Sequence, residues 1–148
     1  MQPSGKITAA AGARGNSVVC VDEIGPGEPI LRIQGPRLRA PGTYTIQRGA
    51  NDHISGDGAT WAYLNHACAP NSAIDFATWE LTTLRTVCAG EEITYNYLTT
   101  EWDMASPFAC NCGAAHCPGT VRGFRHLDMA QRAAIGPLLS PFLHSKFG

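Results

Sequence analysis

Short segments rich in Val, Ile, Thr and aromatic residues, separated by Gly and Pro, dominate the chain. Segments of this length and composition are typical of β-strands rather than helices. We expect strands at residues 18–21, 30–33, 44–47, 74–79, 81–87 and 93–98. The Gly25-Pro26-Gly27 sequence predicts a turn between the first two strands, and residues 49–58 are expected to form a long polar loop.

The pattern changes once, near the C-terminal end. Asp128 is a suitable N-cap, residues 129–135 are mostly good helix formers, and Gly136-Pro137 is a stop signal. No internal repeat or heptad pattern is present. The sequence therefore predicts a mostly β fold with one short helix.

Composition narrows the class of protein. The 148 residues are 44% hydrophobic and 16% charged, which is the balance of one globular domain. A net charge of -1 without a basic run argues against direct binding of nucleic acid. The sequence shows neither an apolar stretch long enough to span a membrane nor the apolar core of a signal peptide. We expect an intracellular protein with no membrane partner.

Three of the six cysteines lie in one short segment. The spacing of Cys110, Cys112 and Cys117, with Gly113 easing the turn, allows one loop to direct three thiolates toward a point. Zinc prefers four such ligands in a tetrahedron, so one further ligand is needed. Cys20, Cys68, Cys88, His66 and His116 are the candidates for it. A redox pair or three ordinary thiols are the alternatives, and a structural metal site is favoured in a reducing compartment.

Two other segments carry more polar chemistry than a β core requires. Residues 63–71 place the amide of Asn65, the imidazole of His66 and the thiol of Cys68 within four positions. Residues 90–97 alternate in a way that predicts Tyr95 and Tyr97 on one face of a strand. Each segment alone is compatible with simple packing, but together with the cysteine loop they indicate a functional site.

These motifs resemble, in order, those of the SET-domain protein lysine methyltransferases. The similarity lies in the opening strand at residues 15–19 with its following turn, in Asn65-His66-Ala67-Cys68-Ala69-Pro70-Asn71, in residues 90–97, and in the cysteine loop, which is similar to the post-SET zinc loop. The resemblance implies a β-clip fold of several short sheets. It also implies a knot-like crossing that brings Asn65, His66 and Tyr97 together.

The resemblance further implies site residues and cofactors. Methyl transfer would use S-adenosylmethionine, with one structural zinc ion. The implied roles are catalytic for Tyr97 and Tyr44, cofactor-binding for Arg14, Asn16, Tyr44, Asn65, His66 and Asn111, product-limiting for Tyr95, and metal-binding for Cys68, Cys110, Cys112 and Cys117. Cys20 and Cys88 would remain as free buried thiols. Tyrosine at the Tyr95 position implies mono- or dimethylation.

The implied organisation is that of a small free-standing enzyme. Its parts are a lead-in at residues 1–13, the SET domain at 14–104, the zinc loop at 105–119 and an extension at 120–148. The partner would be a protein or peptide that presents a lysine, such as a histone-like tail. The alternatives are a SET-like zinc module that binds cofactor or peptide without turnover, since fold does not guarantee activity, and a redox or metal-buffering protein.

Overall fold

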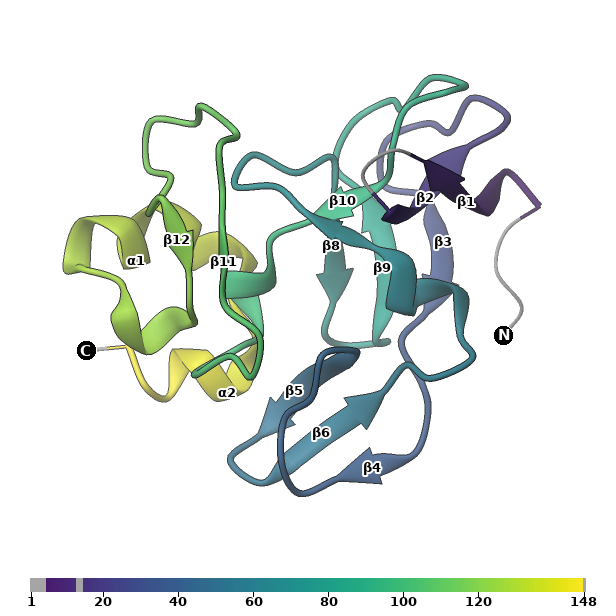
Figure 1. Ribbon diagram of the computed structural model, residues 1–148. Helices are drawn as coiled ribbons and strands as arrows, with labels where there is room; N and C mark the ends of the chain where they lie inside the picture. The colour runs from purple at the N-terminus through teal and green to yellow at the C-terminus, as the bar shows by residue number, and fades with distance from the viewer. Residues whose placement is uncertain (1–4, 13–14, 148) are drawn as a thin grey trace. The chain divides into compact units, whose positions relative to one another are not determined.

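The computed structural model describes residues 5–12 and 15–147 (Figure 1). They form two compact units. The first unit contains the described residues up to Gln34 together with Gly56–Asn96, and the second contains Gly35–Ser55 together with the residues from Tyr97 onward.

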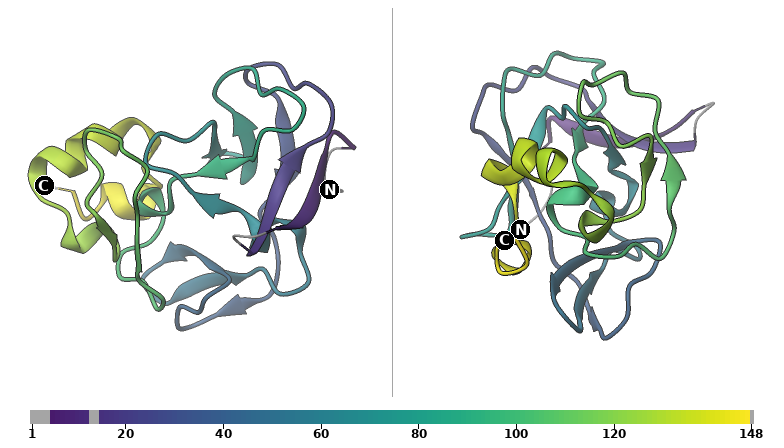
Figure 2. Two further views of the ribbon diagram at one scale, coloured as in Figure 1. Left: turned by 45° about the horizontal axis from the view of Figure 1, so that its top comes forward. Right: turned by 90° about the vertical axis from the view of Figure 1, so that its left-hand side faces the viewer.

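The first unit is built from three small sheets. Its elements are β1 (Ile7–Gly12), β2 (Gly15–Cys20), β3 (Pro29–Arg32), a 3₁₀ turn η1 (Thr60–Tyr63), β7 (Asn65–His66), β8 (Ser72–Asp75), β9 (Glu80–Thr83) and β10 (Thr94–Tyr95). β1 and β2 form an antiparallel hairpin, visible in purple in Figure 2, and β3, β9 and β8 form an antiparallel sheet in that order. β7 and β10 pair in parallel over two residues, Asn65 with Thr94 and His66 with Tyr95.

β-branched and leucine side chains from these strands and from the segments between them make the core of the first unit. Its fully buried members are Val18, Ile24, Ile30, Leu81, Val87 and Ile93. Ile24 and Val87 also form an isolated antiparallel bridge, so residues 84–87 continue alongside the core after β9 has ended. Burial of these side chains supplies most of the free energy that holds such short strands together.

Asn71 fastens the parallel pair from the side. Its Nδ2 donates to the Glu92 carbonyl oxygen (2.8 Å), and its Oδ1 accepts from the Thr94 amide (3.0 Å). The Asn71 amide in turn donates to the Thr94 hydroxyl (3.3 Å). The side chain is 4% exposed, so these bonds are shielded from water. A buried amide thus supplies cross-links that two-residue strands cannot supply themselves.

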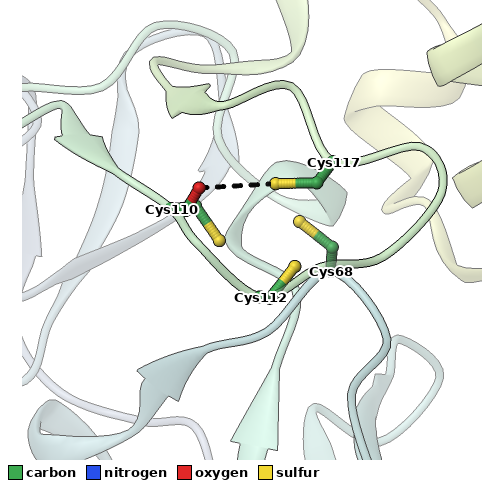
Figure 3. A group of neighbouring side chains, drawn as sticks. All are labelled: Cys68, Cys110, Cys112 and Cys117. Atoms are coloured by element: carbon green, nitrogen blue, oxygen red, sulfur yellow. Dashed lines mark hydrogen bonds between the residues drawn. The ribbon is translucent and has the colours of Figure 1, made fainter.

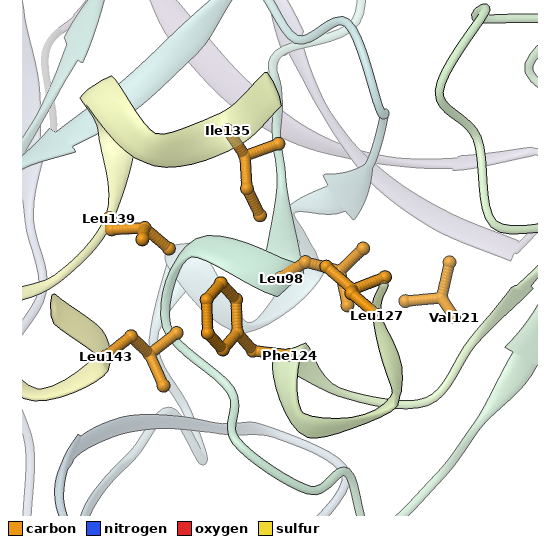
Figure 4. Close-up of a cluster of buried hydrophobic side chains, with 7 residues drawn as sticks. All are labelled: Leu98, Val121, Phe124, Leu127, Ile135, Leu139 and Leu143. Carbon is orange, nitrogen blue, oxygen red and sulfur yellow. The ribbon is translucent and has the colours of Figure 1, made fainter. Parts of the chain in front are cut away.

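The second unit has two small sheets and the helices. Its elements are β4 (Arg37–Leu38), β5 (Thr45–Gly49), β6 (Asp52–Ser55), η2 (Tyr97–Thr99), β11 (Phe108–Ala109), β12 (Thr120–Val121), η3 (Phe124–His126), α1 (Met129–Ile135), η4 (Gly136–Leu138) and α2 (Pro141–His144). β6 lies between β4 and β5, and β11 pairs with β12. Figure 4 shows the core of this unit, where Phe124 is surrounded by Leu98, Leu127, Ile135, Leu139 and Leu143.

The predicted helix is confirmed with its cap. Asp128 accepts a hydrogen bond from the Gln131 amide (2.8 Å), and the Gln131 side chain accepts one from the Asp128 amide (2.9 Å). This capping box satisfies donors that the first helical turn leaves unpaired. A four-residue helix, α2, follows behind a Ser140 N-cap.

Several strands differ from the prediction. β8 ends at Asp75, whose carbonyl accepts from the Trp79 amide (2.6 Å) and closes a turn. β9 ends at Thr83, and β10 ends at Tyr95, where the chain enters the 3₁₀ turn η2. The expected loop at residues 49–58 contains β6, because the alternation in Asp52-His53-Ile54-Ser55 is too short to detect without its partner strands. The mostly β fold class is confirmed.

Across the residues that the structure describes, none of the helices has the length and apolar character that a membrane crossing requires.

Removing the Asn71 side chain tests its role. Asn71→Ala leaves the Glu92 carbonyl and the Thr94 amide without their partner, and we expect it to lower the free energy of unfolding by about 2–4 kcal/mol. Urea denaturation followed by circular dichroism measures this loss. Asn51→Ala, at an exposed turn position, is the matched control and should change the value by less than about 0.5 kcal/mol. Equal changes in the free energy of unfolding for the two substitutions would contradict the stabilising role of the Asn71 hydrogen bonds.

Candidate functional site

The parallel pairing of β7 with β10 positions the polar Asn65-His66 segment that the sequence analysis identified. Asn65 and His66 lie opposite Thr94 and Tyr95, and the Ala67 amide extends the pairing by donating to the Tyr95 carbonyl (3.2 Å). Tyr97 follows two residues after this strand ends. Residues 29 positions apart in the chain are therefore brought into register by main-chain hydrogen bonds.

The Asn65 amide joins three segments of the first unit. Its Nδ2 donates to the carbonyl oxygen of Asn16 on β2 (3.1 Å) and to Oε2 of Glu92 (2.5 Å). A hydrogen bond thus joins Asn16 and Asn65, which are both predicted to bind cofactor. Arg14, predicted to act with them, lies outside the described residues.

His66 is turned toward a cysteine. Its Nε2 lies 3.3 Å from the Cys68 sulfur. Burial lowers the pKa of His66 to about 4, so the ring is neutral at pH 7 and carries one N–H. His66 therefore lies within hydrogen-bond distance of a predicted metal ligand. Groups that form hydrogen bonds with metal ligands help to orient them.

The cysteine sulfurs of Cys68, Cys110, Cys112 and Cys117 all lie within 4.8 Å of one another (Figure 3). The loop that carries the last three is closed by hydrogen bonds from the Cys110 amide to the Gly119 carbonyl (2.7 Å) and from the Cys117 amide to the Ala114 carbonyl (3.1 Å). Cys68 is thus the candidate fourth ligand that the structure brings to the loop. Four sulfurs at this spacing are suited to one metal ion.

The other two cysteines are free, but only one is buried. Cys20 is enclosed in the core, and burial raises the pKa of its thiol. Cys88 is exposed, which corrects the expectation of two buried thiols. Cys88 lies between the Val87 bridge and the turn at Gly90.

The tyrosines occupy different environments. Tyr95 is 4% exposed at the end of β10, whereas Tyr97 begins η2 and packs edge-to-face on Phe108, with ring centroids 5.9 Å apart. The expectation that both lie on one face of a strand is wrong, because the strand ends between them. Tyr44 precedes β5 and is 49% exposed, and Asn111 is exposed between two loop cysteines.

Sequence reasoning missed Glu101. This carboxylate is 7% exposed, and its Oε2 accepts from the Gln47 amide (2.9 Å) and from the Thr100 hydroxyl (2.6 Å). The Gln47 side chain forms a second link, because its Oε1 accepts from the Trp102 amide (2.9 Å). The two residues therefore fasten β5 to the segment that follows Tyr97. A single acid in Thr100-Glu101-Trp102 gives little sign of this role in the sequence.

Comparison with models of known families identifies the family to which these motifs belong. The SET domain family model matches residues 15–98, which is more than half of the chain. The chain belongs to the SET domain family. The matched region contains the β2 opening strand, the Asn65–His66 segment and the strand that leads to Tyr97.

Two curated relatives of the chain are named as methyltransferases. The chain is 38% identical over 111 residues to methyltransferase flvH of Aspergillus flavus, a match that covers 70% of this chain and 61% of flvH. It is 32% identical over 76 residues to human histone-lysine N-methyltransferase 2D, covering 45% of this chain and 1% of that protein. The chain thus spans less than two thirds of the length of each of these two relatives.

The fold also has a solved counterpart. The crystal structure of KRYPTONITE in complex with mCHG DNA and SAH matches with a TM-score of 0.62 at 21% sequence identity, covering 77% of this chain and 28% of that one. The likeness confirms the SET fold that the motifs predicted.

The buried Glu101 predicts a pH dependence of stability. Burial raises the pKa of this carboxyl to about 7, while hydrogen bonds from Gln47 and Thr100 oppose the rise. Between pH about 4.5 and 7 the folded chain holds a proton that the unfolded chain has released, so the free energy of unfolding falls as the pH rises. Relative to Glu101→Gln, which cannot titrate, the wild type should lose roughly 2–3 kcal/mol across this range.

Urea denaturation of both proteins at several pH values measures the difference. Glu80→Gln, which removes a half-buried carboxylate elsewhere in the chain, is the control and should run parallel to the wild type. A difference between wild type and Glu101→Gln that does not change with pH would refute the assignment.

Proposed function

We propose that this SET domain transfers a methyl group from S-adenosylmethionine to the ε-amino group of a lysine in a protein substrate. The observation that carries the proposal is the pairing of Asn65–His66 with the strand that ends two residues before Tyr97. Membership of the SET domain family and the likeness to flvH support it.

The residues of the first unit fit the polar groups of the cofactor. Its methionyl end carries an ammonium and a carboxylate, and its adenine has donor and acceptor edges. Asn65 and the Asn16 carbonyl offer an amide and an acceptor near solvent, and the neutral His66 lies beside them in the chain. We assign cofactor binding to these residues together with Arg14, Tyr44 and Asn111.

S-adenosylmethionine supplies the methyl group on a positively charged sulfonium, so the protein needs little acid–base machinery. It has to hold a neutral amine in line with the methyl carbon and exclude water. A lysine pKa near 10.4 falls when the amine enters an apolar site beside a positive charge. We assign the orienting hydroxyl to Tyr97, whose ring is fixed against Phe108, and a second contact to Tyr44.

Tyr97→Phe tests the catalytic assignment. The substitution keeps the ring packing on Phe108 but removes the hydroxyl, and we expect the rate of methyl transfer to fall roughly 100-fold or more. The measurement is incubation with radiolabelled S-adenosylmethionine and a panel of lysine-rich proteins, including histones. Tyr63→Phe, at an exposed tyrosine with no assigned role in the reaction, is the matched control.

The same assay separates turnover from binding alone. If the wild type transfers no methyl group while S-adenosylmethionine still raises the melting temperature, the domain is a binding module without turnover. Transfer by Tyr97→Phe at the wild-type rate would remove Tyr97 from the mechanism.

Tyr95 is proposed to limit the number of methyl groups added. A buried hydroxyl at this position occupies room and orders its surroundings in a way that a phenylalanine ring does not. We expect Tyr95→Phe to move products from mono- or dimethyl-lysine toward trimethyl-lysine, measured by mass spectrometry of the substrate. An unchanged product distribution at wild-type rates would count against this role.

We further propose that Cys68, Cys110, Cys112 and Cys117 hold one structural zinc ion. The donor set is four thiolates, which is a closed tetrahedral site with no position for a reacting water. The ion would stabilise the loop that carries Asn111, and its loss would destabilise the folded chain.

Metal content checks the zinc assignment. We expect about one zinc per chain by inductively coupled plasma mass spectrometry, and a lower melting temperature after chelation. Cys112→Ser should lose most of the zinc, whereas Cys88→Ser, at an exposed cysteine outside the group, should keep it. Full zinc content in Cys112→Ser would disprove the ligand set.

The proposed partner is a protein or peptide that presents a lysine, with no direct contact to nucleic acid or membrane. An intracellular location and the segment boundaries after residues 13, 104 and 119 stay predictions.

A further inference from the structure

Two cysteines have no part in the proposed reaction or in the proposed zinc site. Cys20 is the last residue of β2 and is 1% exposed, whereas Cys88 is exposed and follows Val87. Both are free thiols, and both belong to the first unit. They stand 68 positions apart in the chain, so only the fold can bring them together.

Main-chain hydrogen bonds hold Cys20 against the turn that Cys88 begins. The Cys20 amide donates to the Glu91 carbonyl (2.8 Å), and the Cys20 carbonyl accepts from the Gly90 amide (2.7 Å). The turn is closed by the Glu91 amide, which donates to the Cys88 carbonyl (3.0 Å). The end of β2 and the start of this turn are therefore fixed beside each other.

The Cys20 thiol faces the main chain that leads into Cys88. Its sulfur lies 3.6 Å from the Val87 carbonyl oxygen, and the Val87 carbonyl carbon is bonded to the Cys88 nitrogen. Standard peptide dimensions then place the Cys20 sulfur within about 6.5 Å of the Cys88 Cα atom. Disulfides join residues whose Cα atoms are about 4.4–6.8 Å apart, so we expect rotation of the two side chains to close the remaining gap.

The surroundings of the two thiols give them different reactivity. The Cys20 thiol donates to the Asp22 carbonyl (2.8 Å), and because Asp22 is exposed, water can replace this donor. Burial raises the pKa of the Cys20 thiol, and neighbouring acidic groups, among them the Cys88 thiol, add to the rise. Cys20 therefore stays protonated inside the core, and the exposed Cys88 is the thiol that a dissolved oxidant reaches first.

We propose that Cys20 and Cys88 form one intramolecular disulfide when the folded chain meets hydrogen peroxide. The Cys88 sulfur attacks one peroxide oxygen, the O–O bond breaks, and a sulfenic acid and one water are formed. The Cys20 sulfur then attacks the Cys88 sulfur, the S–O bond breaks, and the hydroxyl leaves as a second water with the Cys20 proton. Two thiols lose two electrons in total, and the peroxide gains them.

Peptide mapping identifies the bond. The wild type is treated with a stoichiometric amount of hydrogen peroxide, alkylated, and digested with trypsin and a protease that cleaves after glutamate. This digestion separates Cys20 (peptide 15–23), Cys88 (86–91), Cys68 (49–80) and the loop cysteines (102–122). We expect mass spectrometry to find peptides 15–23 and 86–91 joined, two hydrogens lighter than their sum, as the main product that contains Cys88.

The same oxidation in concentrated urea shows whether the fold selects the partner. In an unfolded chain the cost of closing a loop rises with its length, so Cys88 should pair with Cys68 or Cys110, which are 20 and 22 positions away, more often than with Cys20. We expect the 15–23 and 86–91 product to prevail only in the folded chain.

A melting curve tests whether the folded structure accommodates the bond. The disulfide closes a long loop, so the oxidised wild type should melt roughly 5 °C or more above oxidised Cys88→Ser. Cys88→Ser changes an exposed residue, and after peroxide treatment its peptide 15–23 should carry a free, alkylated Cys20.

Three results overturn the proposal. They are the absence of the joined peptides from the folded wild type, the same pairing pattern in buffer and in urea, and an oxidised wild type that melts no higher than oxidised Cys88→Ser. None of them bears on methyl transfer, because neither cysteine belongs to the proposed catalytic or metal-binding residues.

Discussion

The hydrogen bonds between Asn71 and the segment from Glu92 to Thr94 are the constraint on which the candidate site depends. They hold a parallel pair of only two residues per strand, which is too short to be stable alone. Since Asn65 and His66 lie in one strand and Tyr97 follows the other, the register of this pair sets the position of each motif in the first unit. The buried side chain of Asn71 therefore contributes both to the stability of the fold and to the placement of the candidate site.

Buried polar side chains also connect short main-chain segments in the second unit. The Glu101 carboxylate accepts from the Gln47 amide, and the Gln47 side chain accepts from the Trp102 amide. These two hydrogen bonds fasten β5 beside the segment after Tyr97. Short strands leave many main-chain groups without ladder partners, and buried polar side chains satisfy them. Burial at this position raises the pKa of the Glu101 carboxyl to about 7.

Polar groups near the Asn65 amide differ in their exposure to water. Asn71 is enclosed and its bonds are complete, whereas Asn65 and Glu92 contact one another near solvent. His66, which follows Asn65 in β7, is neutral at pH 7, and its ring lies beside the Cys68 sulfur. The arrangement thus joins a proposed cofactor site to a proposed metal site through adjacent residues of one strand.

The sequence alone determined the fold class, the capped helix at residues 129–135 and the family, because these depend on local patterns: strand-length apolar segments, a capping box and motifs of fixed spacing. It also singled out the cysteine loop, but spacing left five candidates for the fourth position. Only the tertiary structure brought Cys68 to that loop, ended β10 before Tyr97, exposed Cys88, and revealed Glu101 and the contact of Glu92 with Asn65. These features depend on which distant segments pack together, and local periodicity carries no record of that packing.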